Sequence, residues 1–207
     1  LAHPPVTFQL SRFEPGALEA VGYIGEQEAA RHMVRTPGAP ERLELRLDES
    51  GRPFAAGGKD VTFLHAELRD AHGTVVPQAW ENVFFGSTGD IELVGVNPFS
   101  SEAGVATILV QTETRKPRGA VYTLCLARDG ERVHILSAAL PFGATSSGYE
   151  VRATTDGSDP GTGAVHHAGP AIGAERVRAA LFVDGRQIVE ADTDTSKFRI
   201  AGSTAPA

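Results

Sequence analysis

Apolar and polar side chains alternate along most of this chain, and a period of two is typical of half-buried β-strands. The stretch over residues 59–77 shows the pattern clearly. Leu64 and Leu68 would share one face of a strand, and His65 and Glu67 would share the other. No stretch shows a sustained helical period. The pattern therefore predicts a fold built of strands.

The stretch over residues 59–77 is interrupted at Asp70 to Gly73. An Asp side chain can accept hydrogen bonds from its own backbone, and Gly can adopt a positive φ, so these residues favour a turn. Val75 and Val76 would then begin a new strand. We expect this turn to serve the architecture rather than a reaction.

Turn residues such as Glu14-Pro15-Gly16 and Asp129-Gly130 separate further alternating segments. Residues 121–126 are apolar on both faces, which predicts a central strand. About seven short strands in roughly 100 residues are typical of an immunoglobulin-like sandwich. The fold class predicted is all-β, with tandem immunoglobulin-like or fibronectin-like β-sandwiches. The other strands are expected at 6–13, 17–24, 27–34, 42–47, 78–86, 91–96, 103–111, 119–127, 132–139, 149–153, 176–183 and 187–190.

Two segments rich in Pro, Gly and small residues, 36–40 and 141–147, mark expected domain boundaries. Residues 1–37 hold too few strands to bury a core alone, so they would pack on the next domain or on a missing preceding segment. The resemblance described below implies that they are the closing strands of a truncated immunoglobulin-like domain. Residues 38–143 would be a complete sandwich, and residues 144–203 a small β-sandwich. The chain begins with Leu1, so we expect a processed product or an excised fragment of a longer protein.

The overall charge and composition narrow the class of partner. The chain has 207 residues, 41% of them hydrophobic, and a formal net charge of −7, which argues against a nucleic-acid partner. No apolar run approaches the roughly 20 residues of a membrane helix, so membrane insertion is not expected. Cys125 is the single cysteine, so an internal disulfide cannot form and the compartment stays open. Its apolar neighbours predict a buried thiol.

No cluster of side chains predicts a reaction, a metal or a cofactor. His166 and His167 are adjacent, and on a strand they would point to opposite faces. The carboxylates Glu190, Asp192 and Asp194 lack the calcium-loop pattern and are expected on a solvated edge. The Gly-x-Ser-x-Gly elbow and the phosphate-loop Lys are both missing. No catalytic residue is predicted.

Two places could bind a sugar. Trp80 is the single tryptophan, and a flat ring can stack on a pyranose face; the alternative is a ring packed between two sheets. Asp156 and Asp159 lie in a turn-dense segment and could bond sugar hydroxyls. The alternative for these aspartates is that they only form turns.

Two parts of the chain resemble known modules. Residues 13–142 resemble the carboxy-terminal region of glycoside hydrolase family 2 enzymes of the β-galactosidase type. The matching pieces include Phe13 to Tyr23, Thr36 to Pro40, Asp60 to Gly73 and Val94 to Asn97. The family often carries a longer loop where this chain has the short segment 98–103. Residues 148–190 resemble the small β-sandwich appended to chitobiase and hexosaminidase-type enzymes, carried by the run Thr-Thr-Asp-Gly-Ser-Asp-Pro that ends at residue 160.

The resemblance implies a parent enzyme whose catalytic carboxylates lie upstream in a (β/α)₈ barrel of about 250 residues. The expected function is therefore a non-catalytic region of a glycosidase, with a structural or substrate-access role. Its expected partners are the upstream catalytic domains of the same polypeptide, and an oligosaccharide is a further candidate. A periplasmic or extracellular location is favoured for the parent. The alternatives are a carbohydrate-binding module and a cell-surface interaction module.

Overall fold

The computed structural model describes residues 7–12, 14–55, 58–130, 132–143, 148–161, 165–166, 169–170 and 176–194. These residues form strands, turns and loops, and none of them is helical, so the predicted all-β class is confirmed. Because the described part of the chain has no helix, it offers none long and apolar enough to cross a membrane. The chain divides into two compact units, Leu1–Thr36 and Pro37–Ala207.

The first unit contains one hairpin, formed by β1 (Ala17–Ile24) and β2 (Gln27–Arg35). Both strands begin where the sequence predicts. All their residues are exposed except Val21, which is half-buried. The prediction of a strand at 6–13 is wrong for the residues that the structure describes, since residues 7–12 form no strand. The alternation there is present, but a strand also needs a hydrogen-bonding neighbour.

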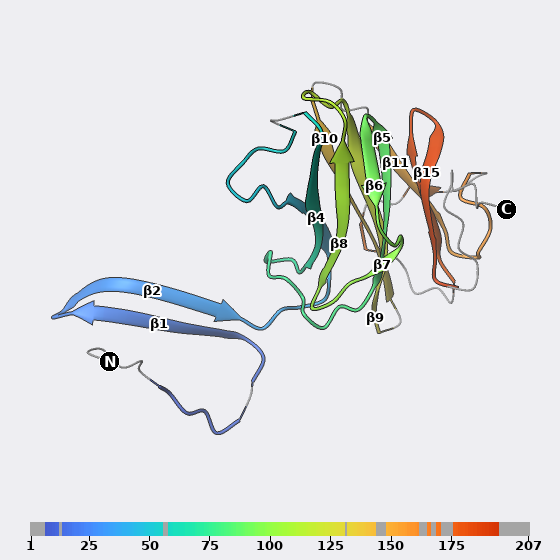
Figure 1. The fold of residues 1–207 in the computed structure, drawn as a ribbon. Helices are drawn as coiled ribbons and strands as arrows, with labels where there is room; N and C mark the ends of the chain where they lie inside the picture. Colours follow the sequence, from blue (N-terminus) through green and yellow to red (C-terminus); the bar gives the residue numbers. More distant parts are fainter. Residues whose placement is uncertain are drawn as a thin grey trace. The chain divides into compact units, whose positions relative to one another are not determined.

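The second unit begins with a two-sheet sandwich (Figure 1). One sheet has the order β3-β4-β8-β6, and the other has the order β13-β10-β9-β5-β7. Their facing sides bury one apolar core that includes Leu64, Val83 and Val110. The strands are β3 (Arg42–Leu47), β4 (Asp60–Arg69), β5 (Asn82–Gly89), β6 (Ile91–Val94), β7 (Phe99–Ser100), β8 (Val105–Thr112), β9 (Gly119–Asp129), β10 (Arg132–Phe142) and β13 (Gly169–Pro170).

A third sheet packs on the outer face of the β13-β10-β9-β5-β7 sheet, which is therefore the middle one of three layers (Figure 1). We call it the middle sheet. The third sheet has the order β12-β11-β14-β15, formed by β11 (Tyr149–Thr154), β12 (Val165–His166), β14 (Arg178–Val183) and β15 (Arg186–Asp192). Leu181 and Val189 from this sheet pack with Tyr122 and Leu124 from the middle sheet in a second core. The third sheet thus shares its core with the sandwich.

Of the residues expected to form a small sandwich at 144–203, those of β11, β12, β14 and β15 form this single sheet, and those of β13 pair with β10 in the middle sheet. The apolar face of the third sheet packs on the middle sheet. The segment 144–147, where the boundary is predicted, lies outside the described residues. The division of the chain at 37 and 143 stays a prediction.

Strand β9 is buried on both faces, as its sequence predicts. Leu124 faces the third sheet and Cys125 faces the first core, and both are fully buried. Gly86 on the neighbouring β5 permits close contact between layers. A Cβ there would lie 2.5 Å from a methyl carbon of Ile188 and of Val189 on β15. Both neighbours are β-branched and stiff at χ1, so only glycine fits without movement.

Asp70 determines how the stretch over residues 59–77 folds. Its buried carboxylate accepts hydrogen bonds from the backbone N–H groups of His72 (2.9 Å), Thr74 (2.8 Å) and Gly38 (3.0 Å). These bonds hold the pKa of Asp70 below its ordinary value, and the bond from Gly38 has the largest effect. Burial acts in the opposite direction and would raise the pKa. The turn forms as predicted, but the expected second strand is only a single bridge, between Arg69 and Val75.

Candidate functional site

Trp80 lies in the loop before β5 and is 66% exposed. The buried Ser101 fixes the backbone on both sides of it. The Ser101 hydroxyl accepts a hydrogen bond from the Glu81 N–H and donates one to the Ala79 carbonyl, each at 2.8 Å. The alternative of a ring between two sheets is therefore not what the structure shows. An exposed aromatic ring on a fixed loop has the form needed for stacking on a sugar.

Asp156 and Asp159 lie together in the loop between β11 and β12. Asp156 Oδ1 accepts from the Ser158 N–H (2.9 Å), and Asp159 Oδ1 accepts from the Gly161 N–H (2.7 Å). Hydrogen bonds from the hydroxyl and N–H of Ser158 hold the pKa of Asp156 below its ordinary value. Each aspartate closes a turn two residues ahead of it, which is the role that Asx turns have in loops.

Trp80 and the two aspartates belong to loops of different sheets. The Trp80 loop leads into the middle sheet, and the aspartate loop belongs to the third sheet. Asp156 and Asp159 each accept a hydrogen bond from an N–H group of their own loop. The three predicted site residues therefore come from two loops that belong to different sheets.

The second acidic cluster is paired with arginines. Arg176 bonds Asp192 (2.6 Å), and Arg178 bonds Glu190 (2.9 Å), where the ends of β14 and β15 meet. Burial acts to raise the pKa of Asp192, but hydrogen bonds from Arg176 and from the Asp194 N–H outweigh it, and the pKa is lowered. These carboxylates are engaged in ion pairs that stabilise the third sheet.

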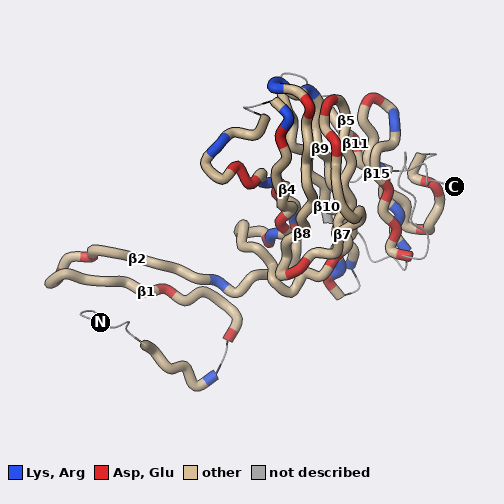
Figure 2. Tube along the Cα trace, in the orientation of Figure 1, with Lys and Arg blue, Asp and Glu red and all other residues tan. Residues whose placement is uncertain are grey.

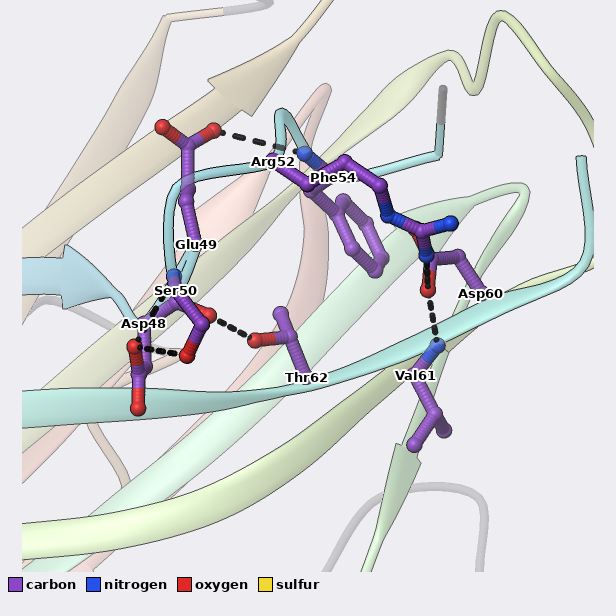
Figure 3. A pocket seen from close by; sticks show the side chains of 8 residues that line it. All are labelled: Asp48, Glu49, Ser50, Arg52, Phe54, Asp60, Val61 and Thr62. Atoms are coloured by element: carbon purple, nitrogen blue, oxygen red, sulfur yellow. Dashed lines mark hydrogen bonds and ion pairs between the residues drawn. The ribbon is translucent and has the colours of Figure 1, made fainter. Parts of the chain in front are cut away.

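A polar pocket of about 240 Å³ lies in the loop between β3 and β4 (Figure 3). Asp60 accepts hydrogen bonds from Arg52 (2.9 Å) and from the Ala55 N–H (2.9 Å), and Asp48 accepts one from the Ser50 hydroxyl (2.9 Å). No periodic pattern in the sequence predicts this pocket, because its residues come from an irregular loop and the strand after it. The lining residues are Asp48, Glu49, Ser50, Arg52, Phe54, Asp60, Val61 and Thr62.

Glu81, next to Trp80, is a titratable residue that sequence reasoning missed. Burial raises the pKa of its carboxyl, and a hydrogen bond from the Arg128 N–H (3.0 Å) opposes that change. A glycosidase needs two carboxyl groups that face each other across the bond to be cleaved. The groups that oppose the rise in the pKa of Glu81 are the N–H and the charge of Arg128, and neither of them is a carboxyl group.

Metal binding finds no support in the part of the chain that the structure describes. No group of three or more His, Cys, Asp or Glu side chains converges there. The side chain of His166 and the whole of His167 lie outside the described residues. Cys125 is fully buried, and burial raises the pKa of its thiol, as expected for a structural cysteine.

Comparison with known proteins gives relatives among glycoside hydrolase family 2 proteins. The chain is 33% identical over 126 residues to a β-galactosidase of Thermoanaerobacter pseudethanolicus, covering 56% of this chain and 17% of that protein. It is 32% identical over 94 residues to the β-galactosidase BoGH2A of Bacteroides ovatus, covering 44% of this chain and 11% of that protein. No protein-family model matches the chain.

Solved structures give the same group of proteins. A glycosyl hydrolase family 2 member from Bacteroides cellulosilyticus aligns with a TM-score of 0.47 and 19% identity, over 64% of this chain and 18% of that one. A β-glucuronidase from glycoside hydrolase family 2 aligns with a TM-score of 0.46 and 22% identity, over 66% and 15%. The chain thus spans less than a fifth of the length of each curated relative, and its relatives are glycoside hydrolase family 2 proteins.

Proposed function

We propose that this chain is a non-catalytic, carboxy-terminal β-sandwich region of a glycoside hydrolase family 2 enzyme. The observation that carries the proposal is the 33% identity to a β-galactosidase over 126 residues that make up only 17% of that protein. The Arg176–Asp192 and Arg178–Glu190 pairs support it, because a carboxylate held in an ion pair with arginine is not free to act as one of the two carboxyl groups that glycoside hydrolysis needs.

The role proposed is structural: the region supports the catalytic domains of the same polypeptide or shapes the approach of an oligosaccharide. In this proposal residues 38–143 are an immunoglobulin-like domain, and residues 144–203 correspond to the module appended to chitobiase-type enzymes. The hairpin at β1 and β2 would complete a preceding immunoglobulin-like domain. Its exposure supports this assignment, since a lone hairpin is marginally stable in water.

An assay of the isolated chain on chromogenic β-galactosides and β-glucuronides tests the non-catalytic assignment. We expect no release of the chromophore above the rate without protein. Turnover that copurifies with the folded chain would overturn the proposal. Heat-unfolded chain is the matched control, because it retains every contaminant that survives heating and loses the fold.

A second candidate function, carbohydrate binding, is favoured by the exposure of Trp80 on a fixed loop. Titration with galacto-oligosaccharides should then change the fluorescence of this single tryptophan in a saturable way. Calorimetry on Trp80→Ala should lose the binding, whereas Phe63→Ala, which removes an exposed ring on β4, should keep it. An unchanged Trp80 signal at millimolar oligosaccharide would exclude this candidate.

A further inference from the structure

The outer face of the β3-β4-β8-β6 sheet carries an exposed apolar row. Phe63 on β4 pairs directly with Leu109 on β8, and Leu109 pairs with Val94 on β6, so the three side chains form one row across three strands. Phe63 is 51% exposed and Val94 is 39% exposed. Val61, two residues before Phe63 on the same face, is also 51% exposed. We call these four residues the apolar row.

The other half of the same face is charged and internally paired. Arg46 lies 3.3 Å from Glu67, and Arg69 lies 2.9 Å from Glu44. Figure 2 shows acidic and basic residues interspersed along β4 and the loop before it. Paired charges of this kind suit contact with water. The apolar row is therefore a local feature and not the general character of this face.

Carboxylates border the apolar row, and three of them form no salt bridge among the described residues, although the charges of Arg46 and His65 act on Asp48 from farther away. The Asp48 N–H donates to the Phe63 carbonyl (2.9 Å), which places Asp48 beside the row, and Glu49 follows in the pocket loop. Glu92 lies on β6 two residues before Val94. No ion pair holds Asp48, Glu49 or Glu92 among the residues that the structure describes.

Neighbouring carboxylates differ from these three, because they are neutralised within the chain. Arg52 pairs with Asp60 (2.9 Å), and Lys59 pairs with Glu113 (2.7 Å). The surface around the apolar row therefore keeps an excess of negative charge after internal pairs are counted. An apolar centre with a charged rim is the usual anatomy of a protein interface.

We propose that the apolar row and its acidic rim are a docking surface for a protein segment that presents apolar side chains between lysines or arginines. Charge complementarity selects this partner. A second copy joined through the same face would bring the acidic rims together, because a two-fold interface is self-complementary. An anionic membrane surface would be repelled. The inference does not depend on the proposed role in a glycosidase.

The test uses the full chain labelled with ¹⁵N and two synthetic pentapeptides, acetyl-Lys-Leu-Lys-Phe-Lys-amide and its charge-reversed form, acetyl-Glu-Leu-Glu-Phe-Glu-amide. We expect the basic peptide to shift the backbone amide signals of residues 61–65, 92–94 and 107–111 in a saturable way. Added salt should weaken its binding, since the rim acts through exposed charges. The acidic peptide should leave these signals unchanged.

Three variants locate the binding energy. Phe63→Ser should raise the dissociation constant at least about tenfold, because exposed aromatic rings dominate interface energetics. Glu92→Gln should weaken binding and reduce its salt dependence. Glu44→Gln is the matched control, since it removes the same charge from the paired half of the face and should leave affinity unchanged. Val94→Ser replaces Phe63→Ser if urea unfolding shows that the latter does not fold.

Several results would overturn the proposal. Absence of saturable shifts with the basic peptide would do so, as would equal binding of the acidic peptide. Equal losses of peptide affinity in Glu92→Gln and Glu44→Gln would show that binding depends only on net charge and not on this surface. A dimer in sedimentation that Phe63→Ser abolishes would assign the surface to a second copy. Shifts of the same amides by lactose would assign it to a sugar.

Discussion

Ending the chain after Gly143 would uncover the face of the middle sheet that the third sheet covers. The side chains exposed would be large and apolar, and each is now at most 8% exposed. Burial of such a side chain contributes about 1.5–3 kcal/mol, so their loss would cost on the order of 10 kcal/mol as an upper estimate. The side chains are Phe84, Tyr122, Leu124, Leu126, Val133 and Ile135.

A cost of that size is comparable to the whole stability of a domain, about 5–15 kcal/mol. We therefore expect the chain ended at Gly143 to aggregate, or to bind a hydrophobic dye and unfold without cooperativity in urea. The matched control begins at Pro37 and lacks the exposed hairpin, and it should keep the unfolding midpoint of the full chain. A soluble, monomeric 1–143 chain with an unchanged midpoint would refute the reasoning. It would also favour the predicted domain boundary near residue 143.

Three further predictions concern single residues. Gly86→Ala should lower the free energy of unfolding, measured in urea, by about 1–3 kcal/mol, because the new Cβ would crowd Ile188 on β15. Gly148→Ala is the control and should change this free energy little, because the space around Gly148 is open. Equal effects of the two substitutions would contradict the close contact between layers. Because the pKa of Asp70 is lowered in the folded chain, its ionised form stabilises the fold above the unfolded pKa of about 3.8, and this contribution is lost as the pH falls through the lower folded value. Urea midpoints measured from pH 7 down to pH 2.5 should therefore fall less in Asp70→Asn than in the parent chain. Parallel curves for the two chains would contradict this. Cys125 should react with a thiol reagent only in denaturant, because it is fully buried and its pKa is raised, and rapid labelling of the native chain would show that β9 is not central.

The sequence could predict most strands of this fold, because alternation and turn residues are local signals. It predicts β1, β2 and β3 from their first residues, and it identifies the apolar β9 as central. It starts β5 four residues early, because residues 78–81 continue the apolar content without being bonded as a strand. Strands of two residues, such as β7 and β12, are too short to show any period.

Other features depend on contacts between distant parts of the chain. Alternation gives β14 an apolar face but does not say that the middle sheet covers it. The hydrogen bond from Gly38 to Asp70 joins residues 32 positions apart, and no local pattern encodes it. Trp80 lies in an irregular loop without a defined face, so its exposure needed the structure. The apolar row became visible only once the strand register was known.

The most direct test of the non-catalytic assignment is the intact mass of the chain after incubation with activated 2-deoxy-2-fluoro glycosides. In a retaining glycosidase, one carboxylate forms a covalent glycosyl-enzyme intermediate, and such a reagent makes that intermediate long-lived. We predict that the 21.8 kDa chain keeps its unmodified mass with both the galactoside and the glucuronide reagent. A stoichiometric glycosyl adduct on one carboxylate of the folded chain would contradict the assignment.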